Sequence, residues 1–319
     1  MEWGMKVKAW VLHNIDDLRL SEVKLPVLSR GEVLVRVKCA GICSSDVQRV
    51  FVSGAYHYPI ILGHEFSGIV EKAYSDAEAS WIGKRVGVYP LLPKFANEGY
   101  RTDGYETSSD YGYLGSRQDG GFAEYVAVPV WNLIEIPEKI GFEEAAMLEP
   151  TSVAFHAVRQ IDFTHVRNVA VIGNGTIGHL IAQWLSIYGV PKITLVGRQD
   201  VLPEEVDVCF EVVGSVEGLE RCITATKPNG QIVVVGNPPA DFHLEQKIYW
   251  QILRKQLVVR GTWNSRFPDD WRKVLDAVGG GRLFLSDFIT HRFGFFDLAA
   301  AFEMVKRKEE QHLKILIHI

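Results

Sequence analysis

Residues of the types that bind zinc stand at separate places in the first half of the sequence. They are a thiol, Cys43, an imidazole, His64, and two carboxylates, Glu65 and Glu149. A catalytic zinc site uses three such protein ligands and keeps a fourth position open for water or substrate. We predict that Cys43 and His64 bind zinc and that either Glu65 or Glu149 completes the set. Each residue alone would more often be an ordinary side chain, so the prediction rests on the set.

Two of the carboxylates near these ligands are candidate catalytic residues. Asp46 follows Cys43 by three positions. It is placed to accept the second ring N–H of His64, which would fix the tautomer that leaves the other nitrogen for the metal. Glu65, one of the two possible carboxylate ligands, is the second candidate.

A dinucleotide-binding motif lies in the second half of the sequence. Residues 168–172 form a β-branched run, glycines follow at 173, 175 and 178, and residues 179–188 have a helical pattern. The first glycine of such a G-x-G-x-x-G permits a tight turn, the second lets the backbone approach the pyrophosphate, and the third lets helix and strand pack closely. The helix N-terminus then offers N–H groups to the phosphates. The candidate cofactor-binding residues of the motif are Gly173, Gly175, Thr176, Ile177 and Gly178.

The end of the next predicted strand bears on the choice between NAD and NADP. An NAD-preferring site usually has a carboxylate there for the ribose 2′-hydroxyl, whereas this chain has Gly197 and Arg198. A guanidinium can bind a 2′-phosphate, so we predict that NADP(H) is favoured over NAD(H). The alternative is a solvated surface arginine. Further candidate cofactor-binding residues at later strand ends are Val213, Gly236 and Thr262.

The pattern of elements predicts two domains. The first 150 residues have short alternating runs typical of an antiparallel barrel, with strands expected at 33–38, 68–71 and 84–89. From residue 142 the period becomes helical, and strands then alternate with helices, which favours a parallel doubly wound sheet. The later strands are expected at 168–172, 192–196, 206–213, 231–235 and 257–260. Residues 98–121 show no hydrophobic period and are expected to form an irregular lobe.

Composition excludes several classes of function. The net charge is −5, which gives no reason to expect nucleic acid as a partner. No run approaches the ~18 apolar residues of a membrane span, and no signal peptide is evident. Four cysteines in 319 residues are too few for a disulfide scaffold, so we expect reduced thiols and a cytoplasmic location.

Taken together, these residues resemble a known family. Gly41-Ile42-Cys43-Ser44-Ser45-Asp46, Gly63-His64-Glu65, Asp119-Gly120-Gly121-Phe122-Ala123-Glu124-Tyr125 and Glu149-Pro150 look like the medium-chain zinc alcohol dehydrogenase superfamily. The resemblance is closest to its sorbitol and polyol branch. Three segments particularly resemble galactitol-1-phosphate 5-dehydrogenases: residues 56–59, 115–117 and 261–264.

The resemblance implies a fold and a mechanism. The fold is α/β: a GroES-like catalytic domain of residues 1–155, completed by 289–319, and a Rossmann domain of residues 156–288, with zinc and nicotinamide held in the cleft between them. Ser45 would hydrogen-bond the substrate oxygen and pass its proton toward solvent. Zinc would act as a Lewis acid on that oxygen while a hydride moves between the carbinol carbon and the nicotinamide. The family also suggests a homodimer or homotetramer, and a strand near Leu283 to Leu285 could pair across its axis.

Three departures from the family pattern refine these expectations. Residues 89–124 lack the four cysteines of a structural zinc, so we predict one zinc per chain and a lobe held by packing, with its tyrosines as candidates. Gln48 stands where some members have a proton-relaying histidine. Only 13 residues separate Gly197 from Glu211, so we predict a Rossmann domain with a shortened second half.

The substrate is expected to be a polyol, a ketose or a sugar phosphate. Ser45, Tyr56, Tyr58 and Arg117 are candidate pocket residues, and a substrate phosphate would need Arg or Lys at the mouth. The candidates for that role are Arg117, Arg254, Lys255 and Arg266. Alternatives are a ketose reductase acting on ribulose 5-phosphate, a zinc-free quinone or enoyl reductase, and a non-catalytic nucleotide-binding protein with the same fold. The complete ligand set favours a zinc enzyme.

Overall fold

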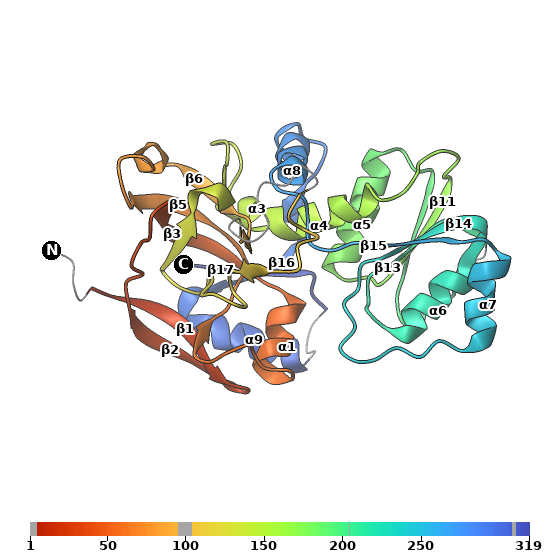
Figure 1. Cartoon of the computed structure of the whole chain (residues 1–319), viewed down its shortest axis with the longest axis horizontal. Helices are drawn as coiled ribbons and strands as arrows, with labels where there is room; N and C mark the ends of the chain where they lie inside the picture. Colours follow the sequence, from red (N-terminus) through yellow and green to blue (C-terminus); the bar gives the residue numbers. More distant parts are fainter. Residues whose placement is uncertain (1–4, 95–103, 204, 308–310) are drawn as a thin grey trace. The chain divides into compact units, whose positions relative to one another are not determined.

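The computed structural model describes residues 5–94, 104–203, 205–307 and 311–319. The chain divides into two compact units, one of residues 1–149 with 267–319 and the other of residues 150–266. Figure 1 shows the chain coloured from its N-terminus to its C-terminus. No helix among the described residues is both long and apolar enough to cross a membrane.

The first unit is built mainly on a large sheet. In the described chain its strand order is β10-β6-β5-β3-β17-β16, and β9 pairs with β3. All of these pairs are antiparallel except β16 with β17. The strands are β3 (Glu32–Ile42), β5 (Glu65–Ala73), β6 (Arg85–Val88), β9 (Tyr125–Pro129), β10 (Leu133–Glu135), β16 (Ile289–Gly294) and β17 (Lys314–His318). The strands predicted near 33–38, 68–71 and 84–89 are therefore confirmed, with longer bounds.

Smaller elements complete the first unit. A second sheet has the order β2-β1-β4, and β7 pairs with β8. Their bounds are β1 (Lys6–Asn14), β2 (Asp17–Lys24), β4 (Ile60–Ile61), β7 (Leu91–Pro93) and β8 (Tyr111–Tyr113). The helices are α1 (Ser44–Phe51), α3 (Phe142–Ala146), α8 (Asp269–Gly279) and α9 (Leu298–Arg307), and α4 (Leu148–Val158) starts in this unit. The 3-10 turns are η1 (Ala79–Trp81), η2 (Val130–Asn132), η3 (Leu285–Phe288) and η4 (Phe295–Asp297).

The register of three strands brings one end of each together. Gly41, near the end of β3, lies opposite Glu65, the first residue of β5. Ile42 lies opposite Ile315, the second residue of β17. Antiparallel pairing therefore places the end of β3 beside the starts of β5 and β17. β17 lies more than 200 residues after β3 in the sequence.

The core of this unit explains why the strands form. Alternate side chains of β3 point into it, including Val33, Val35 and Val37, all almost fully buried. From the other side Phe302 of α9 packs edge-on against Phe122, with ring centroids 5.9 Å apart. The periodic apolar residues of the barrel thus enclose one continuous core beneath the strand ends.

The described part of the predicted irregular lobe contains a strand, β8, that the sequence did not indicate. β8 pairs with β7 through Leu91 and Tyr113, and glycines around it hid any hydrophobic alternation. Residues 95–103, which include the first part of the lobe as predicted, lie outside the described residues. Tyr105 is buried and packs against Trp131 at 5.6 Å, as expected for a lobe held by its tyrosines.

The second unit is a parallel sheet of the predicted kind. Its five described strands have the order β12-β11-β13-β14-β15. The strands are β11 (Asn168–Ile172), β12 (Lys192–Val196), β13 (Val206–Glu211), β14 (Thr226–Val234) and β15 (Val258–Gly261), and the helices are α5 (Thr176–Ile187), α6 (Val216–Ala225) and α7 (Gln246–Arg254). Figure 1 labels these helices together with β11, β13, β14 and β15 of this sheet.

The shortening lies in the first half of this sheet, so the prediction of a shortened second half was wrong. A full doubly wound sheet has the order 3-2-1-4-5-6, in which the third strand lies outside the second. Here the second strand, β12, is at the edge. The described residues between Gly197 and Glu205 contain neither helix nor strand, because so short a connection can only cross from β12 to β13. The second half, from β13 to β15, is complete.

Two further expectations differ from the structure. The chain returns to the first unit at Phe267, earlier than the predicted residue 289. The reason is aromatic packing, since Phe267 stacks on Tyr89 at 4.8 Å and Trp271 contacts the same ring at 5.7 Å. The segment from Leu283 to Leu285 is not an edge strand, because both leucines are buried and Leu285 starts a 3-10 turn.

Candidate metal and dinucleotide sites

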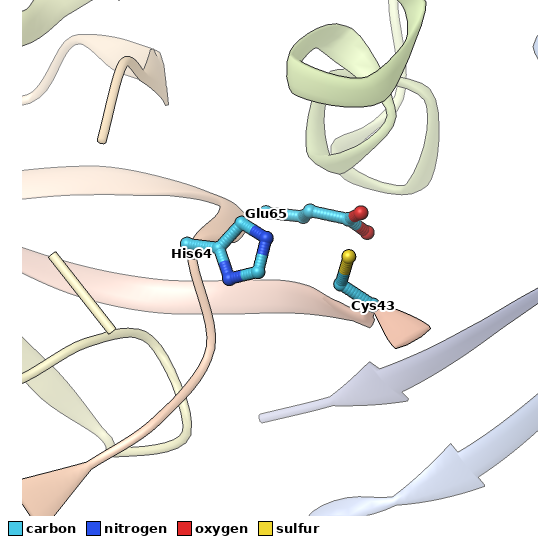
Figure 2. A group of neighbouring side chains, drawn as sticks. All are labelled: Cys43, His64 and Glu65. Carbon is cyan, nitrogen blue, oxygen red and sulfur yellow. The ribbon is translucent and has the colours of Figure 1, made fainter. Parts of the chain in front are cut away.

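Three of the predicted zinc ligands come together at the meeting strand ends. Cys43 is the residue between β3 and α1, and His64 and Glu65 stand at the start of β5. One ligand atom from each lies within 4.8 Å of the other two. Figure 2 shows the Cys43 sulfur, one His64 nitrogen and the Glu65 carboxylate pointing toward a common space. Cys43 is half-buried, and His64 and Glu65 are buried.

Asp46 lies against both Cys43 and His64. Its Oδ2 accepts a hydrogen bond from the Cys43 backbone N–H at 3.1 Å. Its Oδ1 lies 3.4 Å from Nδ1 of His64, and neither of these buried atoms has a hydrogen-bond partner among the described residues. The distance is long for an N–H···O bond, but it places a carboxylate oxygen beside Nδ1. Nε2 is therefore the nitrogen of His64 left for a metal.

Electrostatics in this group favour charged forms. Burial is the largest influence on Asp46 and by itself raises its pKa, but the adjacent His64 and Arg49 charges hold that pKa below its ordinary value. Burial likewise lowers the pKa of His64, yet the negative Asp46 and Cys43 outweigh it and raise that pKa well above its ordinary value. A cation is therefore stabilised at this position.

Lys314, the first residue of β17, was missed by the sequence analysis. Its side chain is buried, donates to Oε2 of Glu65, and lies 3.3 Å from the Ile42 carbonyl oxygen. Burial lowers the pKa of Lys314, but the negative charges of Glu65 and Cys43 raise it by more. The net shift of the pKa is therefore upward. The sequence held no signal for this contact, since nothing in it shows that the last strand pairs with β3.

Glu149 lies near the other ligands but outside the three-residue cluster. Its Oε1 accepts a hydrogen bond from the Tyr113 hydroxyl at 3.2 Å, and the Tyr113 ring contacts His64 at 5.8 Å. Burial, followed by the negative charge of Glu65, raises the pKa of Glu149 to about 7, although His64 and Lys314 act in the opposite direction. Tyr113 is a second residue of the site that sequence reasoning did not find.

The predicted proton-transfer residue, Ser45, lies in the first turn of α1. Its Oγ accepts a hydrogen bond from Nη1 of Arg49 at 2.9 Å. The same guanidinium atom lies 3.8 Å from Oδ1 of Asp46. Arg49 thus links the serine hydroxyl to the carboxylate behind His64, a role that was not predicted.

The donor set fits zinc. A thiolate, an imidazole and a carboxylate are the ligand types of catalytic zinc sites. The orientation of His64 by Asp46 matches the carboxylate–histidine arrangement behind such ligands. Cys43, His64 and Glu65 are therefore able to hold the metal, with Glu149 nearby.

The dinucleotide motif of the second unit has the expected local geometry. Gly173 has a φ of +121°, which favours glycine, and an added Cβ on Gly178 would lie 1.9 Å from the Gly173 carbonyl oxygen. Gly175 caps α5 without a side-chain hydrogen bond, and an added Cβ there would meet no atom within 4 Å. Thr176 and Ile177 form the first positions of the helix. The open N-terminus of α5 fits a pyrophosphate.

Arg198 lies on a loop that is held from two sides. Its side chain is exposed just after β12. The Gly197 backbone N–H donates to Asp200 Oδ2 at 2.7 Å. Arg221 of α6 donates to the Gly197 carbonyl at 3.0 Å and to the Asp200 carbonyl at 2.8 Å. Asp200 and Arg221 were not predicted, and they fix the backbone that carries Arg198.

The remaining predicted cofactor residues also follow the carboxyl ends of strands. Glu211 Oε1 accepts from the backbone N–H groups of Val213 and Gly214, each at 2.9 Å. A Cβ on Gly236 would lie 1.9 Å from the Gly214 nitrogen, so these two loops touch. Thr262 donates its backbone N–H to the Val234 carbonyl at 3.0 Å. Ligands of open α/β sheets bind at this edge.

Comparison with known proteins assigns the family. A model of the alcohol dehydrogenase GroES-like domain matches residues 29–138, and one of the zinc-binding dehydrogenase domain matches residues 198–279. Galactitol 1-phosphate 5-dehydrogenase of Escherichia coli strain K12 is 31% identical over 332 residues, covering 93% of this chain and 96% of that protein. (R,R)-butanediol dehydrogenase of Bacillus subtilis strain 168 is 29% identical, with 98% and 99% covered.

Solved structures agree. The crystal structure of galactitol-1-phosphate dehydrogenase from Escherichia coli matches with a TM-score of 0.85 at 28% identity, over 98% of this chain and 100% of that one. The chain therefore belongs to the medium-chain zinc alcohol dehydrogenase superfamily, in its polyol branch. It is a zinc-dependent, nicotinamide-linked oxidoreductase of secondary alcohols, with a GroES-like domain and a Rossmann domain.

Proposed function

We propose that this enzyme transfers a hydride between NADPH and a ketose or ketose phosphate, giving the polyol, with zinc held by Cys43, His64 and Glu65. The convergence of these three ligand atoms within 4.8 Å carries the proposal. When bound, zinc supplies a Lewis acid that polarises the substrate oxygen. Glu149 lies outside the cluster and is available to a water or hydroxyl beside the metal.

The surrounding residues have separate roles in this scheme. Asp46 orients His64, and Lys314 balances the charge of Glu65. Ser45 relays a proton: in reduction it gives its hydroxyl proton to the substrate oxygen and regains one from solvent, and in oxidation the proton moves from the substrate oxygen through Ser45 to solvent. Arg49, hydrogen-bonded to Ser45, keeps that hydroxyl in place.

A panel of substrates and coenzymes tests the proposal. The zinc-loaded enzyme is assayed with D-ribulose, D-fructose, D-ribulose 5-phosphate and the matching polyols, including galactitol 1-phosphate, using NADH and NADPH. We expect turnover of at least one ketose–polyol pair in both directions. A ribulose 5-phosphate reductase would act selectively on that ketose, a zinc-free quinone or enoyl reductase would act on quinones or enones after chelation, and a non-catalytic nucleotide-binding protein would act on none.

The coenzyme proposed is NADP(H). Arg198 is exposed on a fixed loop where NAD-preferring sites have a carboxylate. We expect Arg198→Ala to lower kcat/KM with NADPH by about 10- to 100-fold, the range for a lost charge-assisted hydrogen bond, and to change the value with NADH little. Equal efficiencies with both coenzymes in the wild type would refute this preference and, with it, reduction as the favoured direction.

Three further proposals concern the whole protein. We propose one zinc per chain, because the one metal-binding group among the described residues is Cys43, His64 and Glu65. The four free cysteines support a cytoplasmic location.

A homodimer or homotetramer could form through β15, the edge strand of its sheet, where Val258 and Val259 are both more than 40% exposed. Sedimentation of the wild type and of Val259→Lys checks this, since a charge at that edge should weaken association.

A further inference from the structure

Arg117 is an arginine held without a carboxylate partner in the first unit. Its guanidinium lies over the Tyr111 ring at 4.4 Å and over the Tyr56 ring at 5.0 Å. Its Nη1 donates to the Tyr111 carbonyl oxygen at 2.6 Å. The ion pairs of the described residues include none with Arg117, so its charge and its other N–H donors remain available.

The backbone of Arg117 is fixed as firmly as its side chain. Its N–H donates to the Tyr113 carbonyl at 2.9 Å, and its carbonyl is 3.1 Å from Nε2 of His57, which can only act as donor to it. Residues from β8, from the turn after it and from the loop that follows α1 thus converge on one guanidinium. Such preorganisation lowers the entropy lost when a ligand binds.

This guanidinium lies close to the metal site. The Tyr111 ring that it covers is 6.3 Å from the Tyr113 ring, which is 5.8 Å from the His64 ring. The turn that carries Arg117 rests on the residue before His64, since a Cβ on Gly115 would lie 2.5 Å from the Gly63 carbonyl oxygen. Two ring contacts therefore separate a metal ligand from an unpaired fixed cation.

The other basic candidates from the sequence have less suitable surroundings. Lys255 donates to three backbone carbonyls, those of Ile223, Thr224 and Thr226, at 2.8 to 3.0 Å. It therefore stabilises the end of α6. Arg254 lies over Trp250 at 4.9 Å on the exposed face of α7, and Arg266 has interactions of its own.

We propose that Arg117 binds the terminal phosphate of the substrate, so that the enzyme acts on phosphorylated ketoses and polyols in preference to neutral ones. The proposal rests on the function proposed above. A guanidinium matches the planar, two-oxygen edge of a phosphate better than an ammonium does. Tyr56, whose side chain is 68% exposed, covers one face of Arg117 and leaves the edge of the guanidinium for the anion.

The test compares matched substrates in three variants. kcat/KM is measured for D-ribulose 5-phosphate against D-ribulose and for galactitol 1-phosphate against galactitol. We expect Arg117→Ala to lower the values for the phosphorylated members by about 10- to 100-fold, mainly through KM, and to leave those of the neutral members nearly unchanged. Arg117→Lys should retain part of the preference. Arg254→Ala is the matched control, an arginine also stacked on an aromatic ring, and should change neither.

A binding measurement keeps the proposal open to refutation without turnover. Inorganic phosphate is titrated by calorimetry into the zinc-loaded enzyme saturated with NADPH, so that the N-terminus of α5 and Arg198 are already occupied. We expect binding in the wild type and in Arg254→Ala but none in Arg117→Ala at equal zinc content. An unchanged substrate ratio or unchanged phosphate binding in Arg117→Ala overturns the proposal, as does a preference for sugar acids over phosphates. Turnover of neutral polyols without phosphate preference also overturns it, but leaves the proposed function standing. Absence of all turnover removes the proposed function instead.

Discussion

At the scale of single residues, the candidate zinc site consists of buried acidic and basic side chains that lie next to one another. Glu65 accepts from Lys314, and His64 faces Asp46. A buried charge is tolerated when it is paired, and removing one partner is costly. In the proposed site the metal would add a second cation beside Glu65, so zinc and Lys314 would together balance this carboxylate.

Lys314→Met tests that sharing, because methionine has a similar shape and no charge. Without zinc the variant leaves Glu65 buried and unpaired, which we expect to lower the free energy of unfolding by about 3 kcal/mol. With zinc bound the loss should be distinctly smaller. Urea unfolding with and without the metal measures both values. An equal loss in the two forms would show that zinc does not share the compensation of Glu65 with Lys314.

Residue types and spacing were enough to predict Cys43, His64, Glu65 and Asp46 as one site. Lys314 and Tyr113 could not be found in this way, because their contribution depends on which strands pair. The same holds for Arg49, whose position on α1 matters through the hydroxyl it meets. Long-range pairing is the information that a single sequence lacks.

At the scale of elements, two glycines near the turn between β11 and α5 are needed for different reasons, one for packing and one for coenzyme binding. Gly178 has no room for a Cβ, whereas Gly175 has open space around it. We expect Gly178→Ala to lose both thermal stability and NADPH binding. Gly175→Ala should keep its melting temperature within a few degrees and lose coenzyme binding, because the added methyl occupies the place of the pyrophosphate. Thermal unfolding and NADPH fluorescence titration measure the two properties. Retained binding in Gly175→Ala would contradict this assignment.

The end of β13 provides a prediction for pH. Burial raises the pKa of Glu211, and its backbone N–H donors offset this only in part. A carboxyl whose pKa is higher in the folded state destabilises the fold where it must ionise. That cost is absent at pH values below the pKa that Glu211 has in the unfolded chain. It is complete at pH values above the pKa that Glu211 has in the folded protein. The stability of Glu211→Gln relative to wild type should therefore improve as pH rises from 4 to 8. A gap that is constant or widens against the variant over this range would show that Glu211 does not carry the cost.

Most strands were predictable because β-branched runs and glycine turns mark them. β8 was not, since Tyr-Gly-Tyr has no alternation. The position of the missing Rossmann strand was also mispredicted. The short connection after β12 is evident in the sequence, but only the strand order shows that it removes an element from the first half.

At the scale of the whole molecule, two separately formed sites must serve one reaction. The first unit carries the candidate metal ligands and Arg117, and the second carries the glycine turn proposed for the coenzyme. The fold and its family followed from motifs in the correct order. The domain boundary at Phe267 did not, because it depends on an aromatic cluster with Tyr89 and Trp271.

The central claim is that catalysis depends on zinc held by Cys43, His64 and Glu65. It is tested most directly by measuring zinc content and NADPH-dependent ketose reduction together, in wild type and in Cys43→Ser, with circular dichroism as the control for folding. We predict one zinc per wild-type chain and loss of both metal and turnover in the folded variant. A folded Cys43→Ser enzyme that is free of zinc and still reduces the ketose would contradict the account.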